Sequence, residues 1–149
     1  MHATPPTDTR AAVAAAPAFR HLLRVYWEDT DAAGVVFYAN YLKFFERART
    51  EWLRSLGFSQ QHLLRHDGVM FVVTDTALRC LRAARLDDLL EVTVQVQQAG
   101  RASLRIAQQA WRDATLVAEG DIRIGCVGAG PTGDFRPCRI PAAILDKIS

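Results

Sequence analysis

The spacing of hydrophobic positions predicts one long helix that follows a first strand. Residues Phe19–Trp27 are rich in aromatic and branched aliphatic side chains, as strands are. From Tyr38 to Leu56, hydrophobic residues recur every three or four positions, which places them on one face of a helix. This face consists of Tyr41, Phe45, Ala48, Trp52 and Leu56. Gly57 follows directly, and because glycine is favoured just past a helix C-terminus, we expect the helix to end there.

After Gly68 the hydrophobic pattern changes to that of strands. The expected strands are Val69–Ala84, Leu90–Gln97, Ser103–Trp111 and Thr115–Val127, and short helices are expected at Ser59–Arg65 and Pro141–Ile148. The links between strands are too short for parallel crossovers, so neighbouring strands should be antiparallel. One helix against one antiparallel sheet is a two-layer α+β fold. Residues 69–73 are hydrophobic on both faces, which suggests that a second subunit covers part of the sheet.

Composition limits the classes of protein to consider. A chain of 149 residues has room for one domain. We place this domain at residues 18–149 and interpret residues 1–17 as a flexible leader. The net charge of +2 gives no reason to expect a nucleic-acid or membrane partner, and the sequence contains no apolar run of about 18 residues that could cross a bilayer.

The three cysteines are widely separated and show no metal-ligand spacing. We therefore expect neither a disulfide framework nor a zinc site. Cys80 and Cys126 lie in hydrophobic runs and are predicted to be buried, whereas Cys138 lies in the tail. A reducing, cytoplasmic compartment fits this cysteine usage best.

The candidate chemistry is concentrated in the loop before the long helix. Asp31 lies in a polar segment that contains Gly34, a few residues before the helix begins. The unpaired N–H groups of a helix N-terminus can stabilise the oxyanion that forms when a thioester carbonyl is attacked. Asp31 could attack that carbonyl itself or activate a water molecule. In an unrelated loop the same residues would merely cap a turn.

Other polar residues compete with Asp31 for the catalytic role. Asp29 is expected to order the loop rather than to react. Glu46 is adjacent to Arg47 and has helical spacing to Arg49, so a surface ion pair is its simpler interpretation. The histidines have no partner at the spacing of a Ser/His/Asp or Cys/His site, and no Gly-x-Ser-x-Gly motif supports a serine nucleophile.

Two segments resemble a known family. Residues 29–41, D-T-D-A-A-G-V-V-F-Y-A-N-Y, and residues 44–49, F-F-E-R-A-R, are similar to the signature of the 4-hydroxybenzoyl-CoA thioesterase family of hotdog-fold proteins. The similarity is greatest to the YbgC-type acyl-CoA thioesterases associated with the Tol–Pal system, and residues 84–88, A-R-L-D-D, resemble a further element of that branch. The resemblance extends from about Leu22 to Val127. It implies a hotdog fold, in which a curved antiparallel sheet of about five strands wraps a long central helix.

The resemblance also implies roles for individual residues. The family's catalytic aspartate falls on Asp31, and the backbone N–H groups that polarise the thioester carbonyl fall around Tyr38. Gly34 and Val36 belong to the same loop and are expected to contact substrate. The sequence departs from the YbgC pattern at Tyr38, where histidine is frequent, and at Ala83, where proline is usual. The first departure affects any imidazole role and the acyl preference.

The expected activity is hydrolysis of acyl-CoA with short-chain or aromatic acyl groups, without a metal or cofactor. Coenzyme A carries phosphates that arginine binds well; Arg101 is the preferred candidate, and Arg82 and Arg85 are alternatives. The family's active sites lie between subunits, which implies a homodimer or homotetramer. The resemblance also allows an acyl carrier protein as substrate and a peripheral link to the Tol–Pal or phospholipid-synthesis machinery.

Two other functions are kept as alternatives. The domain could be a non-catalytic module that binds acyl-CoA or an acyl carrier protein. It could also be a hotdog dehydratase, but those enzymes pair a histidine with a carboxylate, and no histidine lies between Tyr26 and Arg49.

Overall fold

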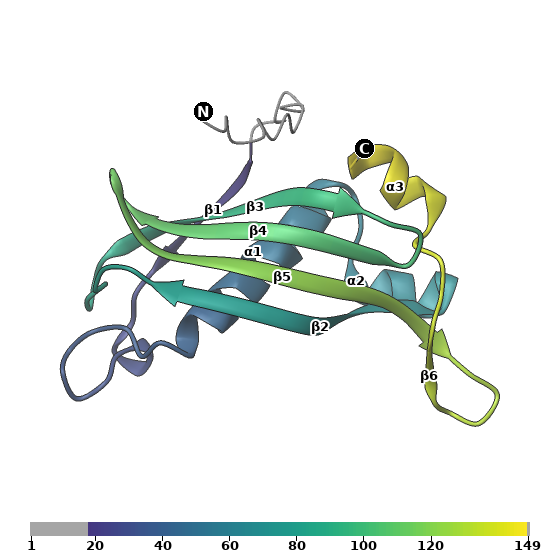
Figure 1. Ribbon diagram of the computed structural model, residues 1–149, viewed down its shortest axis with the longest axis horizontal. Helices are drawn as coiled ribbons and strands as arrows, with labels where there is room; N and C mark the ends of the chain where they lie inside the picture. The colour runs from purple at the N-terminus through teal and green to yellow at the C-terminus, as the bar shows by residue number, and fades with distance from the viewer. Residues whose placement is uncertain (1–17, 149) are drawn as a thin grey trace, which may run out of the picture.

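The computed structural model describes residues 18–148, so the predicted leader lies outside the described residues. The chain forms a strand, a long helix, a run of antiparallel strands and a short C-terminal helix (Figure 1). The elements are β1 (Phe19–Arg24), the 3₁₀ helix η1 (Trp27–Asp29), α1 (Asn40–Ser55), α2 (Gln60–His62), the π-helical turn η2 (Leu63–Asp67), β2 (Val69–Cys80), β3 (Leu89–Ala99), β4 (Ser103–Arg112), β5 (Thr115–Ala129), β6 (Phe135–Pro137) and α3 (Ala142–Ile148). The predicted order is confirmed. Helix α1 begins two residues later than predicted, because Tyr38 and Ala39 form a turn before it.

The strands form one antiparallel sheet with the order β1-β3-β4-β5-β2, and β6 pairs with β5 beyond the start of β4. The sheet thus has six strands rather than the expected five or so, because the tail returns as the three-residue strand β6. Strands β1 and β2 are its two edges. The hotdog α+β prediction is confirmed.

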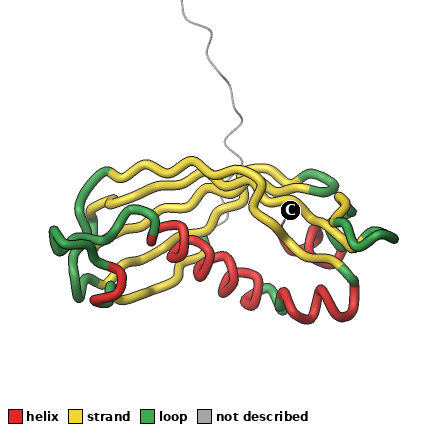
Figure 2. The backbone as a smooth tube through the Cα atoms, turned by 90° about the horizontal axis from the view of Figure 1, so that it is seen from below, coloured by secondary structure: helices red, strands yellow, loops and turns green. Residues whose placement is uncertain are grey.

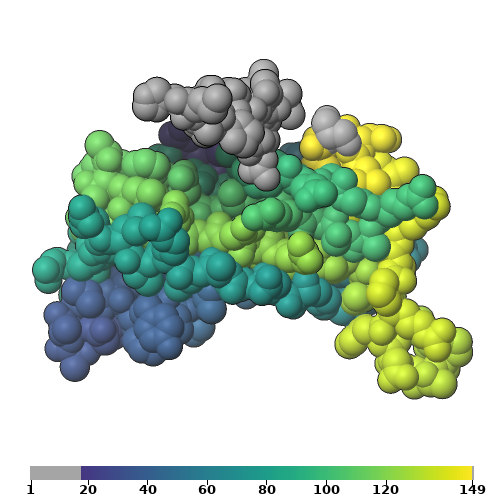
Figure 3. Space-filling model, in the orientation of Figure 1, coloured from purple at the N-terminus to yellow at the C-terminus, as the bar shows by residue number. Residues whose placement is uncertain are grey.

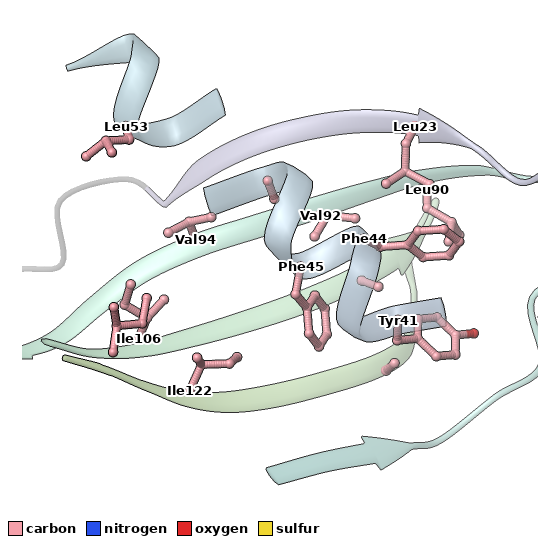
Figure 4. Close-up of a cluster of buried hydrophobic side chains, with 14 of the residues drawn as sticks. Leu23, Tyr41, Phe44, Phe45, Leu53, Leu90, Val92, Val94, Ile106 and Ile122 are labelled. Atoms are coloured by element: carbon pink, nitrogen blue, oxygen red, sulfur yellow. The ribbon is translucent and has the colours of Figure 1, made fainter. Parts of the chain in front are cut away.

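Helix α1 lies against one face of the sheet, and Figure 2 shows the sheet arched over it. Tyr41, Phe44 and Phe45 are buried and point from α1 into the core (Figure 4). Phe45 packs against Gly120 of β5; a Cβ atom added to Gly120 would lie 2.7 Å from Phe45 Cε2. Glycine at this position is therefore what allows the ring to contact the sheet.

A buried amide connects the helix to the sheet. Gln108 of β4 has no exposed surface, and its Nε2 donates to the backbone oxygens of Phe45 (3.0 Å) and Thr93 (3.3 Å). Its Oε1 accepts from Arg49 Nη1 at 2.8 Å. All three hydrogen bonds of the Gln108 side chain are made to other parts of the protein, so the amide fixes the position of α1 over β3 and β4.

The cysteine predictions are met in part. Cys126 is buried, as predicted, but Cys80 is exposed because it lies at the end of the edge strand β2. The structure also brings Cys138 next to Cys126, with 3.6 Å between the two sulfur atoms. No spacing of residues indicated this proximity, because the turn that creates it lies in the irregular Gly- and Pro-rich tail.

Candidate active site

Asp31 lies in a tight loop between η1 and α1. Its Oδ1 accepts from the backbone N–H groups of Ala33 (2.9 Å) and Val35 (3.4 Å). The backbone closes the turn as well: Asp31 N donates to Val35 O, and Gly34 N donates to Asp31 O, both at 2.9 Å. Gly34 has a φ of 76°, a conformation that favours glycine. The Asp31 side chain is exposed in the single chain and could meet a substrate that covers the loop.

The rival carboxylate, Asp29, supports the loop. Asp29 is only 6% exposed, and its Oδ2 accepts from Tyr26 N at 2.8 Å. Its backbone oxygen accepts from Phe37 N (2.9 Å) and from Asn40 Nδ2 (2.8 Å). The expectation that Asp29 orders the loop is consistent with this geometry. Asn40, at the first position of α1, thus connects the helix to the loop through its side chain. The sequence analysis did not predict this role, although a polar residue at a helix start could have indicated it.

The loop is also attached to the segment before β3. Val36 N donates to Ala84 O at 2.8 Å, and Val35 forms a bridge with Arg85. Asp88 Oδ2 accepts from the backbone N–H of Arg85 at 2.8 Å. Residues 84–88 thus form the second wall of the Asp31 loop. Val36 is buried in this contact, and Gly34 is exposed.

The start of α1 offers unpaired donors. In the described part of the chain, the backbone N–H groups of Tyr38 and Ala39 have no hydrogen-bond acceptor, whereas Asn40 N donates to Phe37 O. No side chain caps the helix at Ala39. Two free N–H groups at the positive end of a 16-residue helix can hold a developing negative charge. They follow Asp31 by seven and eight residues on the same loop.

Glu46 lies on α1, six residues or about one and two-thirds turns beyond the helix start. Among residues 18–148 it forms no ion pair with Arg47 or Arg49, contrary to the predicted surface pair. Arg49 is instead turned toward Gln108, and burial lowers the pKa of Arg49 while the negative charge of Glu46 opposes that shift.

A cavity of about 240 Å³ lies along the second half of α1. Most of its lining is hydrophobic, with Glu46 and Arg49 as charged members. Its hydrophobic lining includes Leu53, Phe71, Leu104, Ile124 and Ile144. Asp31 does not border it, so the cavity and the loop are separate within one chain.

The arginines considered for coenzyme binding are far apart. Arg85 is beside the Asp31 loop through its bridge to Val35. Arg101 lies in the β3–β4 turn, where its backbone oxygen accepts from Ile140 N at 2.8 Å. Strand β3 has 11 residues and spans about 33 Å, so the turn that contains Arg101 and the Asp31 loop are at opposite ends of the sheet (Figure 1). The structure therefore brings together Asp31, Gly34, Val36 and Tyr38, but not Arg101, within one chain.

Residues 18–148, the described part of the chain, contain no group of metal-ligating side chains and no helix that could span a membrane. Within this range, no three side chains of His, Cys, Asp or Glu are grouped closely enough to hold a metal ion. None of the helices in the same range has both the length and the hydrophobicity needed to cross a membrane.

A sheet arched over a central helix is the architecture of the hotdog class of proteins (Figure 2), and in this chain a carboxylate loop and free N–H groups lie at the start of that helix. Residues 25–148 match the family described as the thioesterase-like superfamily. The chain belongs to this superfamily and is a thioester hydrolase.

Named relatives agree with this assignment. The chain is 45% identical to the acyl-CoA thioesterase YbgC of Haemophilus influenzae over 126 residues, which are 85% of this chain and 90% of the relative. It is 44% identical to the acyl-CoA thioester hydrolase YbgC of Escherichia coli O6:H1, over 87% of this chain and 95% of the relative. Among solved structures, a probable thioesterase from Bartonella henselae has a TM-score of 0.76 and 31% identity, covering 83% of this chain and 99% of that one. A 4-hydroxybenzoyl-CoA thioesterase complexed with 4-hydroxybenzoyl-CoA has a TM-score of 0.82 over 90% of this chain and all of its own; at 19% identity this comparison shows the fold alone.

Proposed function

We propose that the protein hydrolyses acyl-CoA thioesters, with Asp31 as the reacting carboxylate and the N–H groups of Tyr38 and Ala39 as the oxyanion site. One observation carries the proposal: an exposed carboxylate and two adjacent backbone N–H groups without acceptors lie on one loop, in which the N–H groups of residues 30–37, apart from that of Ala32, are hydrogen-bonded. The names of the YbgC relatives support coenzyme A as the leaving group.

The chemistry has two routes, and both end in a carboxylic acid and free coenzyme A. In the first, Asp31 attacks the carbonyl carbon, coenzyme A leaves as the thiolate, and water hydrolyses the resulting anhydride. In the second, Asp31 takes a proton from a water molecule, which attacks the carbonyl carbon, and the coenzyme A thiolate leaves. In either route the negative charge on the carbonyl oxygen develops between the N–H groups of Tyr38 and Ala39.

We further propose that the complete site needs a second copy of the chain. Arg101 lies too far along the sheet to reach a substrate on the Asp31 loop of its own chain. It can bind coenzyme phosphates only for another subunit's Asp31, in a homodimer or homotetramer. Arg85 is the candidate within the same chain. The exposed rings of Phe37 and Tyr38, 44% and 63% exposed, support a short-chain or aromatic acyl group beside the loop.

Acyl carrier protein as an alternative thioester carrier, a link to the Tol–Pal or phospholipid-synthesis machinery and a cytoplasmic location remain predictions. Parallel assays with acylated coenzyme A and acylated carrier protein would separate the two carriers.

The test is thiol release from a panel of acyl-CoA substrates, followed with a free-thiol reagent. Asp31→Asn should lower turnover by roughly 10²- to 10⁴-fold, the usual contribution of a positioned acid or base. Asp146→Asn, an exposed carboxylate on α3, is the matched control and should leave the rate unchanged. An Asp31→Asn protein with full turnover would refute the role of Asp31.

The alternatives give different results in the same experiments. A binding module would bind acyl-CoA without releasing thiol from any member of the panel. A dehydratase would hydrate enoyl-CoA, which a separate absorbance assay measures.

A further inference from the structure

A pair of thiols joins the end of β5 to the tail. Cys126 Sγ and Cys138 Sγ are 3.6 Å apart. Cys138 N donates to Cys126 O at 2.9 Å, in line with the β5–β6 register that pairs Val127 with Pro137. The two cysteines are therefore directly opposite each other on neighbouring antiparallel segments.

This arrangement is compatible with a disulfide. Residues directly opposite each other in antiparallel strands have Cα atoms about 4.5–5.5 Å apart, and disulfides accept about 4.4–6.8 Å. The sulfur atoms have to approach by about 1.5 Å to form a bond of about 2.05 Å. Small rotations of the two side chains can supply this movement without a change in strand pairing.

The two thiols differ in access. Cys138 is partly exposed, whereas Cys126 has no exposed surface. Burial and the neighbouring Cys138 thiol raise the pKa of Cys126, so Cys126 stays protonated and shielded from solvent. Cys138 is the thiol that an oxidant in solution can reach.

We propose that Cys126 and Cys138 form a reversible, oxidation-sensitive pair in which a hydroperoxide converts two thiols into one disulfide. The Cys138 thiolate attacks the hydroperoxide and becomes a sulfenic acid, and the hydroperoxide leaves as hydroxide or alkoxide. Cys126 then attacks the Cys138 sulfur; the hydroxyl group of the sulfenic acid leaves with the Cys126 proton as water. Two electrons pass from the thiols to the peroxide.

The bond fixes the C-terminal segment to the sheet. The 127–137 segment between the cysteines contains the β5–β6 hairpin, which projects from the body of the protein (Figure 3). Directly after Cys138, Ile140 N bonds to Arg101 O, and Ile144 of α3 lines the cavity along α1. The disulfide therefore ties the hairpin and the lead-in to α3 to one strand.

The experiment uses the full chain with Cys80→Ser, because exposed Cys80 could link two molecules. Cys80 pairs with Ala118, eight residues or about 27 Å along β5 from Cys126, so it cannot join the pair within one chain. Folded protein is treated with dilute hydrogen peroxide, alkylated and digested with trypsin. Because trypsin does not cut between Arg136 and Pro137, both cysteines remain in one peptide, residues 124–139. Mass spectrometry should find this peptide lighter by two hydrogen atoms and without alkylation, and dithiothreitol should restore two alkylated thiols.

A second variant and a second readout complete the test. In a Cys126→Ser, Cys80→Ser protein, dimedone should label Cys138 as the sulfenic acid. Amide hydrogen exchange of residues 135–141 should slow at least tenfold on oxidation of the Cys80→Ser protein. The proposal is overturned if the folded protein keeps both thiols alkylatable, if the bond forms only after denaturation, or if Cys138 oxidises only to higher acids or to links between chains.

Discussion

The contact between Gly120 and Phe45 makes a quantitative prediction about stability. In Gly120→Ala the new Cβ atom would lie 2.7 Å from Phe45 Cε2 and 3.1 Å from both Phe45 Cδ2 and Ile122 Cδ1. Carbon atoms prefer separations of about 3.5–4.0 Å, so the ring would have to move by about 1 Å. The ring has no free space to move into, because Phe45 is fully buried and Gln108 Nε2 donates a hydrogen bond to its backbone oxygen.

The size of the effect follows from overpacking. Extra methyl groups in a packed core destabilise by about 1–3 kcal/mol. A loss of about 2 kcal/mol lowers the Tm by roughly 4–8 °C for a domain of this size. Urea and thermal unfolding of the wild type and Gly120→Ala, at one protein concentration, would measure both quantities.

A matched control lies on the same strand. In Gly125→Ala the Cβ atom would lie 3.3 Å from Thr74 Cγ2, the end of an exposed side chain that can move away. This variant should be close to wild type. The double variant Gly120→Ala, Phe45→Leu should lose less stability than the sum of the single losses, since the smaller side chain removes the clash. If Gly120→Ala is as stable as Gly125→Ala, or if the losses simply add, the packing argument is wrong.

Two further predictions concern the loop and the pH dependence. Asn40→Ala removes the bond to the Asp29 backbone oxygen and should lower kcat/KM in the thiol-release assay about tenfold, equal to about 1.4 kcal/mol. The control variant Gln97→Ala changes an exposed side chain on β3 and should have no effect. Equal rates for the two variants would contradict the structural role of Asn40. Burial raises the pKa of Tyr41 to about 12. Because an unfolded tyrosine ionises near pH 10, its contribution to stability is complete below pH 10 and is lost as the pH rises from about 10 to about 12. Tyr41→Phe should therefore lose less stability over this range in urea unfolding, and parallel pH profiles would count against the assignment.

The sequence predicted the features that depend on local periodicity. Tyr41, Phe45 and Ala48 are buried as the helical spacing required, and Val92 and Val94 of β3 are buried as the alternation required. The spacing predicted too narrow a buried face for α1. The arched sheet covers more of the helix than this face, so Phe44 and Leu53 are also buried.

Contacts between segments far apart in the chain could not be predicted from the spacing of residues. Thr93 was expected on a polar face but is buried, and its Oγ1 is satisfied there by accepting from Gln109 N on the neighbouring strand. The bond between Arg49 and Gln108 spans 59 residues, and it replaces the expected ion pair of the arginine with a glutamate three residues away. Local spacing cannot rank such partners, because their proximity is a product of the sheet order.

The same distinction applies to the candidate site. The position of Asp31 in a loop before the helix, and the structural part played by Asp29, could be anticipated from residue types and the family signature. The attachment of Val36 to Ala84 joins segments 48 residues apart, and the opposite placement of Arg101 follows from the direction of β3. Neither can be obtained without the topology.

The Asp31 loop is held by main-chain hydrogen bonds together with the side chains of Asp29, Asp31 and Asn40. Side chains at positions 32, 33, 35, 37 and 38 take no part in those bonds. Evolution, or a protein engineer, can thus exchange these groups to suit a new acyl chain while the reacting carboxylate keeps its place. A change of substrate preference therefore requires different side chains at these positions and leaves the backbone of the loop unchanged.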